Sequence, residues 1–146
     1  VVPVDLGMAG EPVPGVQNCC IAAGTADFTT GPAMTRQQAV DAIAAGMGLV
    51  RAQKAAGVQL LATGEMGIGN TTTSSAVAAV LLGAPVQSMT GRGAGLSDAG
   101  LARKIDAIRR GIARNQPNPA DPLDVLAKLG GFDIAGLCGI FQSGAL

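Results

Sequence analysis

The chain has 146 residues, no histidine, tryptophan or tyrosine, and 10 basic against 10 acidic side chains, which gives zero formal net charge. The absence of histidine excludes Ser-His-Asp and Cys-His catalysis and every histidine-ligated zinc site. Without net positive charge, and with only 2% aromatic residues on which bases could stack, the chain is not expected to bind nucleic acid. The hydrophobic share of 48% predicts a folded chain, which at this length is one domain or part of one.

The three cysteines, Cys19, Cys20 and Cys138, are odd in number and lack the CxxC spacing of metal or redox sites. They predict reduced thiols in a cytoplasmic protein. No run reaches the roughly 20 apolar residues that span a bilayer, so no membrane partner is expected. The chain begins at Val1 without the basic segment of a signal peptide and stops at Leu146 inside a predicted helix. We therefore expect that it is cut at both ends.

The first third predicts a strand over residues 1–6, a loop rich in glycine and proline, and a second extended segment over residues 16–23. Thr35 and Gln38 have capping-box spacing at the start of a helix that ends at Gly57. Two glycines inside this helix, Gly46 and Gly48, indicate that another backbone packs closely against it.

The remaining segments alternate between extended and helical patterns. The apolar run of residues 58–63 predicts a buried strand, and residues 86–90 predict another. Helices are predicted from the end of a glycine-rich loop to about Leu82, from Ser97 and Asp98 to about Asn115, from Asp121-Pro122 to Gly130, and from a cap at Asp133 onward. This order predicts an α/β fold with a parallel, Rossmann-like sheet flanked by helices.

The strongest local signal is the glycine-rich loop of residues 64–73, which reads Gly-Glu-Met-Gly-Ile-Gly-Asn-Thr-Thr-Thr. Glycines allow a ligand to approach the backbone, and free N–H groups at a helix start favour an anion. No lysine follows the glycines, so the loop is not a P-loop. The hydroxyls of residues 71–73 can cap the helix or donate to a phosphate. A tight turn with ordinary capping is the alternative interpretation.

Glu65 lies at the carboxyl end of the predicted strand 58–63, where α/β folds bind ligands. A phosphate would repel its carboxylate, so we expect Glu65 to face ribose hydroxyls or a developing cation. A solvated carboxylate at the mouth of a loop is the alternative.

A second glycine-rich loop, residues 91–97, offers another backbone nest for an anion. Lys104, on the following helix, could reach back over the ligand. Spacing does not distinguish Lys104 from Arg103 in this role, and most of the basic residues on this helix are expected to be solvated. The aspartates show no calcium or paired-carboxylate spacing, so no metal is expected.

These residues predict an α/β protein that binds a phosphorylated, nucleotide-like small molecule at two glycine loops. Three classes remain open at this point: a transferase acting on a phosphoribosyl compound, a non-catalytic nucleotide- or phosphate-binding module, and a structural fragment.

Several motifs in order resemble the nicotinate-nucleotide–dimethylbenzimidazole phosphoribosyltransferase family. They are residues 31–35 (Gly-Pro-Ala-Met-Thr), 64–72, 101–105 (Leu-Ala-Arg-Lys-Ile), 115–119 (Asn-Gln-Pro-Asn-Pro) and 124–133 (Asp-Val-Leu-Ala-Lys-Leu-Gly-Gly-Phe-Asp). The resemblance covers essentially the whole chain. It implies that residues 1–146 are the central part of the family's large α/β domain, with the small helical domain largely missing, and that full-length members form homodimers.

The resemblance also implies an activity. The family transfers the phosphoribosyl group of nicotinate mononucleotide to 5,6-dimethylbenzimidazole, giving α-ribazole 5'-phosphate and nicotinate for the lower ligand of cobalamin, without a metal or organic cofactor. It implies that Glu65, Met66 and Gly67 contact the ribotide and that Gly93 and Lys104 lie near its phosphate. The family's general base is a glutamate near the C-terminus of full-length members, and residues 1–146 hold no counterpart of it. We therefore expect that the chain contains no catalytic residue of its own and lacks full activity.

Overall fold

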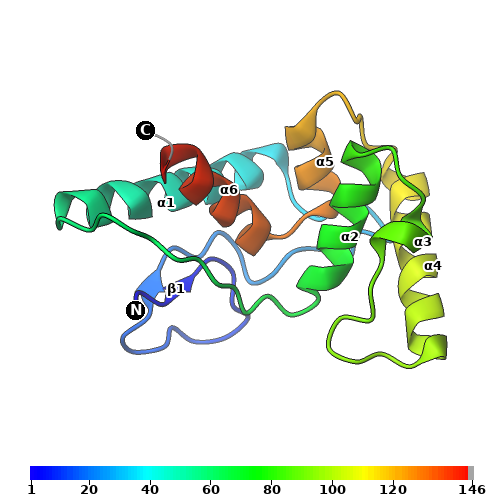
Figure 1. Ribbon diagram of the computed structural model, residues 1–146, viewed down its shortest axis with the longest axis horizontal. Coiled ribbons are helices and arrows are strands. Elements are labelled where there is room, and N and C mark those ends of the chain that lie inside the picture. Colours follow the sequence, from blue (N-terminus) through cyan, green and yellow to red (C-terminus); the bar gives the residue numbers. More distant parts are fainter. Residues whose placement is uncertain (145–146) are drawn as a thin grey trace.

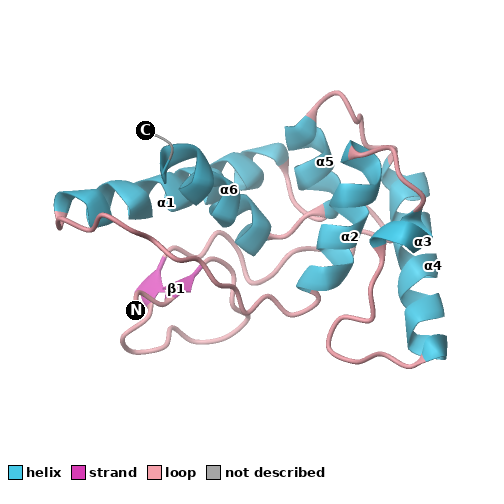
Figure 2. Ribbon diagram, viewed as in Figure 1, coloured by secondary structure: helices cyan, strands magenta, loops and turns pink. Residues whose placement is uncertain are grey.

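The computed structural model describes residues 1–144 as a mixed α/β structure that is mostly helical, with one small parallel sheet (Figures 1 and 2). In the sheet, Val4 of β1 (Val4–Asp5) lies opposite Gln17 of β2 (Gln17–Asn18). The helices are α1 (Arg36–Ala55), α2 (Asn70–Leu81), α3 (Val86–Met89), α4 (Asp98–Asn115), α5 (Pro122–Leu129) and α6 (Phe132–Gly144). None of them, within residues 1–144, is both long and apolar enough to cross a bilayer. The end of the predicted last helix, residues 145–146, lies outside the described residues.

The α/β class with parallel strands is confirmed, but the predicted strand at residues 58–63 is wrong. This segment is extended and exposed, and the side chain of Leu60 is 88% exposed. A strand needs the backbone of a neighbouring strand to satisfy its N–H and C=O groups, and no strand lies beside residues 58–63 in the described part of the chain. Figure 1 shows the segment passing below α1 toward α2.

The strand predicted at residues 86–90 is also wrong, because these residues form the single helical turn α3. Pro85 occupies the N-cap position, and its fixed φ favours the start of a helix. The hydroxyls of Ser88 and Thr90 donate to the carbonyls of Pro85 and Val86 at 2.7 and 2.6 Å, which satisfies these carbonyls locally. In the first third, the predicted strands are confirmed only over the two-residue elements β1 and β2.

The predicted helix starts are confirmed at three positions. The Thr35 hydroxyl accepts from the N–H of Gln38 at 3.1 Å, and the Gln38 side chain accepts from the N–H of Thr35 at 2.8 Å. Ser97 accepts from Gly100 at 3.2 Å, and Asp121 caps α5. Asp98, by contrast, is the first residue of α4 and not its cap.

Helices α1 and α6 lie side by side (Figure 1). Glycines allow their backbones to approach closely. A Cβ atom on Gly46 would overlap the carbonyl oxygen of Gly136, and one on Gly139 would overlap the carbonyl oxygen of Ile43. The close approach predicted at Gly46 is therefore confirmed. At Gly48 it is wrong, because a Cβ there would meet nothing within 4 Å.

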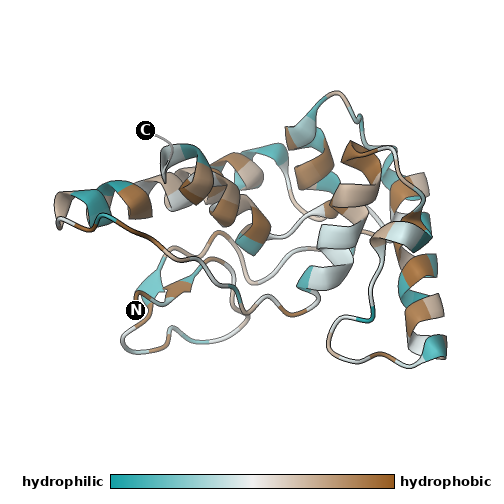
Figure 3. Cartoon of the chain, viewed as in Figure 1, coloured by the Kyte–Doolittle hydropathy of each residue, from teal (hydrophilic) through white to brown (hydrophobic). Residues whose placement is uncertain are grey.

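Two hydrophobic clusters share helix α5. One cluster joins α5, through Leu126 and Ala127, to α1 and to the start of α6. The other joins α5, through Val125 and Leu129, to α2 and α4. Figure 3 shows hydrophobic residues along α4, α5 and α6. The clusters thereby hold α2, α4 and the start of α6, which carry the candidate site, in fixed positions.

Candidate functional site

The glycine loop of residues 64–69 folds back on itself before α2 begins. The Glu65 carboxylate accepts a hydrogen bond from the N–H of Gly67 at 2.6 Å, and the N–H of Asn70 donates to the Gly67 carbonyl at 3.0 Å. Gly69 is the N-cap of α2 with a φ of 82°, a conformation that glycine adopts without strain, and no side chain caps the helix. Glu65 is exposed, and its hydrogen bond to Gly67 fixes the direction in which its second oxygen can face a ligand.

The carboxylate of Asp133 contacts this loop at Gly67 and the first residue of α2, Asn70. This carboxylate accepts a hydrogen bond from the side-chain amide of Asn70 and packs so tightly on Gly67 that a Cβ there would overlap it. The prediction that Asp133 caps the last helix is therefore wrong, since α6 already begins at Phe132 and the carboxylate binds Asn70 of α2. The contact fixes the glycine loop against the start of α6.

Glu65, Met66 and Gly67 line a cleft of about 1350 Å³. Its walls come from the first nine residues, from residues 60–68 and from the inner side of α6, and Asn70 and Asp133 also face it. The Met66 side chain is 91% exposed. The three predicted ribotide-contacting residues therefore lie together at the edge of one cavity, with the paired Asn70 and Asp133 beside them.

Lys104 is the buried cation of α4. Its side chain is 7% exposed, and its ammonium donates to the Thr71 hydroxyl at 2.8 Å and to the Gly91 carbonyl at 3.0 Å. Lys104 lies one turn before the fully buried Ile108, so the helical period turns it inward, whereas the neighbouring Arg103 is exposed. Lys104 thus joins the second glycine loop to the start of α2.

Burial lowers the pKa of Lys104 from its ordinary value, because desolvation disfavours the charged amine. The folded chain therefore binds fewer protons than the unfolded chain between the lowered pKa and the ordinary value of 10.5. We expect the free energy of unfolding of the wild-type chain to rise with pH through this window. This rise should be absent in Lys104→Met. Urea unfolding of both proteins from neutral pH to above 10.5 measures the difference. Parallel pH profiles for the two proteins would contradict the assignment.

Gly93 lies beside the Lys104 ammonium. Its φ is 56°, and a Cβ would stand 2.8 Å from the Thr71 hydroxyl oxygen and 3.5 Å from the Lys104 nitrogen. A side chain at this position would therefore crowd the Thr71 hydroxyl that binds the ammonium group. Gly93 and Lys104, which were predicted to lie near one phosphate, lie next to each other.

The predicted site residues form two groups, one on each side of the N-terminus of α2. Glu65, Met66 and Gly67 precede this helix end, and Gly93 and Lys104 contact it through Thr71. Lys104 and Gly93 do not line the large cleft. In the described residues, no three His, Cys, Asp or Glu side chains are grouped to hold a metal ion.

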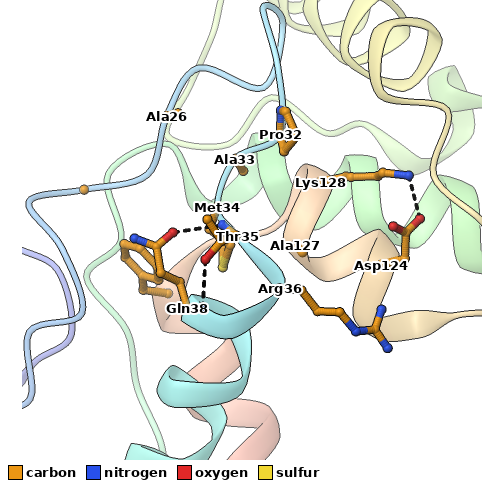
Figure 4. Close-up of a pocket in the computed structure, with 12 residues that line it drawn as sticks. Ala26, Pro32, Ala33, Met34, Thr35, Arg36, Gln38, Asp124, Ala127 and Lys128 are labelled. Carbon is orange, nitrogen blue, oxygen red and sulfur yellow. Dashed lines mark hydrogen bonds and ion pairs between the residues drawn. The ribbon is translucent and has the colours of Figure 1, made fainter.

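A second pocket, of about 550 Å³, lies where the Thr35 cap meets α5 (Figure 4). Its charged groups are already paired. Lys128 contacts Asp124 at 2.9 Å, and the hydrogen bond from Arg36 holds the pKa of Asp121 below its ordinary value. A backbone hydrogen bond from Asn118 likewise lowers the pKa of Asp124. With its charges paired in this way, the pocket is the weaker candidate for binding a phosphorylated ligand.

Sequence reasoning missed two polar residues at the site. Asn70 and Asp133 lie 63 positions apart, and no local pattern brings them together. Thr71 was noted only as one of three hydroxyls. A signal was available only for the choice between Lys104 and Arg103. Lys104 lies four residues before Ile108, on the inward face of its helix.

Known protein sequences and structures resemble the chain over almost its whole length. A protein-family model described as "Phosphoribosyltransferase" matches residues 1–146. The nicotinate-nucleotide–dimethylbenzimidazole phosphoribosyltransferases of Desulforudis audaxviator and Ruminiclostridium cellulolyticum are each 53% identical to the chain over 99% of its length. The crystal structure of CobT from Thermus thermophilus superposes with a TM-score of 0.92 at 40% identity, covering 99% of this chain and 44% of that one.

These matches define the chain first as a phosphoribosyltransferase sequence. More narrowly, it belongs to the nicotinate-nucleotide–dimethylbenzimidazole phosphoribosyltransferase family. The chain spans 42% of the length of both curated relatives named above.

Proposed function

We propose that this chain supplies the ribotide-binding part of an enzyme that moves the phosphoribosyl group of nicotinate mononucleotide to 5,6-dimethylbenzimidazole, releasing nicotinate and α-ribazole 5'-phosphate. The relatives carry both substrates in their names. The observation that carries the proposal is the convergence of Lys104, Thr71 and Gly93 at the start of α2, beside the loop that holds Glu65. In this proposal the first group supplies donors for the phosphate, and the Glu65 carboxylate faces the sugar.

The geometry suits displacement at the anomeric carbon of the ribose. As nicotinate leaves, positive charge develops on the sugar, and the exposed Glu65 carboxylate stabilises it electrostatically. The attacking nitrogen of dimethylbenzimidazole approaches from the opposite face, so the β-nucleotide gives the α-product. Lys104 and the loop N–H groups hold the phosphate and thereby orient the sugar for in-line attack. In this proposal Met66 and Gly67 contact the ribotide, and Gly93 leaves room for its phosphate.

Calorimetric titration of the 146-residue chain with nicotinate mononucleotide tests the proposal. We expect saturable binding that is tighter than the binding of adenosine monophosphate, which has the same ribose 5'-phosphate and a different base. Similar affinities for both nucleotides would indicate a non-catalytic nucleotide-binding module. No binding by a chain with a cooperative unfolding transition would overturn the proposal.

We further place the enzyme in the cytoplasm as a homodimer. Cys19, Cys20 and Cys138 carry free thiols, and burial raises the pKa of Cys138, which keeps it protonated near neutral pH. Reduced thiols are typical of a cytoplasmic protein. The dimer rests on the family resemblance alone.

A further inference from the structure

We propose that Thr71 binds the same anion as Lys104: its hydroxyl oxygen positions the Lys104 ammonium, and its hydroxyl proton donates to an oxygen of the bound phosphate. The inference rests on the proposed function and assigns to this site a further residue with a role of its own. Thr71 is the second residue of α2, and it is exposed where Lys104 is buried.

The hydroxyl groups of α2 differ in what they bind. Thr73 donates to the Asn70 carbonyl at 2.9 Å, and Ser75 donates to the Thr71 carbonyl at 2.7 Å. Ser74 donates to the side-chain oxygen of Asn70 at 3.1 Å. These three hydroxyl protons are used within the helix.

The Thr71 hydroxyl has the opposite role. It accepts from Lys104 at 2.8 Å, and its proton has no acceptor among residues 1–144. A hydroxyl group can accept and donate at the same time. A proton on an exposed oxygen next to a fixed ammonium is therefore free to donate to a ligand.

The Lys104 ammonium is left with one proton for the same ligand. Two of its three donors are used by Thr71 and by the Gly91 carbonyl. Both bonds hold the nitrogen in place, and Gly93 keeps the space beside the hydroxyl and the ammonium clear of a side chain. The Lys104 nitrogen and the Thr71 hydroxyl oxygen lie 2.8 Å apart, a spacing that suits donation to two oxygens of one phosphate group.

The test compares Thr71→Val, Thr71→Ala and Thr71→Ser with a control on the same helix, Ser75→Ala, which removes a hydroxyl whose proton is used within the helix. Nicotinate mononucleotide is titrated by calorimetry, and inorganic phosphate is titrated by ³¹P NMR as a probe without sugar or base. We expect Thr71→Val and Thr71→Ala to weaken binding of both ligands about tenfold to a hundredfold, the usual range for a hydrogen bond to a charged group. Thr71→Ser keeps the hydroxyl and should retain wild-type affinity, as should Ser75→Ala. Urea unfolding of each variant reports whether the fold is intact.

The outcomes separate this inference from the proposed function. Wild-type affinity for nicotinate mononucleotide in folded Thr71→Val or Thr71→Ala would overturn the role of Thr71 and leave the proposed function standing. A loss in Thr71→Ser equal to that in Thr71→Val would also overturn it, because the hydroxyl would then not be the group that matters. Phosphate binding that depends on Thr71, without any preference for nicotinate mononucleotide, would support the role of Thr71 and contradict the proposed substrate. A folded wild-type chain that binds neither ligand would overturn both.

Discussion

Replacing Gly46 by alanine is expected to lower the free energy of unfolding by about 3 kcal/mol, at the upper end of the usual cost of overpacking. The added methyl group would overlap the backbone carbonyl of Gly136. Unlike a side chain, a helical carbonyl cannot rotate away, so α1 and α6 would have to separate. That separation would open the cluster formed by Ala39, Ala42 and Ala135.

Gly48 provides the matched control, two residues along the same helix. A methyl group there meets nothing within 4 Å. Gly48→Ala is therefore expected to raise stability by up to about 1 kcal/mol, because alanine loses less backbone entropy in a helix. Urea unfolding measures both changes. Equal effects of the two substitutions would show that α1 and α6 do not approach as closely as described.

Replacing Lys104 by methionine is expected to weaken the binding of nicotinate mononucleotide about a hundredfold, which corresponds to about 2.7 kcal/mol. This loss is at the strong end for one hydrogen bond to a charged group. The ammonium is already held by Thr71 and Gly91, so little further ordering is needed when a phosphate binds. Methionine has a similar length and fills the same buried space without the charge.

Arg103→Met serves as the control, because Arg103 also lies on α4 but is exposed. It removes one positive charge from the same helix and should leave the affinity close to that of the wild type at physiological salt. Calorimetry with both variants measures the difference. Equal losses in the two variants would mean that the general positive charge of α4, and not the fixed ammonium, attracts the ligand.

Features that depend on neighbouring residues could be predicted from the sequence. The Thr35–Gln38 capping box and the Asp121-Pro122 start of α5 depend on atoms within one helical turn, and the structure has both. Features that depend on distant chain segments could not be predicted. Gly46 and Gly48 lie two positions apart in the same helix, and the close approach of α6 is to Gly46 alone.

The same reasoning explains the errors. The composition of residues 58–63 suits a buried strand, but a strand also requires a partner, which residues 1–144 do not place beside this segment. Asp133 follows a glycine pair and suits a helix cap, yet its carboxylate binds Asn70 on another helix. At the candidate site, spacing was not taken to distinguish Lys104 from Arg103, although the position of Lys104 four residues before Ile108 turns it inward. Its contact with Thr71 depends on how α2 and α4 pack.

The position of α5 between the two hydrophobic clusters affects how the molecule unfolds. This eight-residue helix contributes side chains to both clusters, so neither cluster can dissolve without removing apolar partners from the other. We therefore expect the two ends of the molecule to be thermodynamically coupled and to unfold as one cooperative unit. We therefore also expect that a change which loosens α1 increases the fraction of molecules in which the contact between Lys104 and Thr71 is broken.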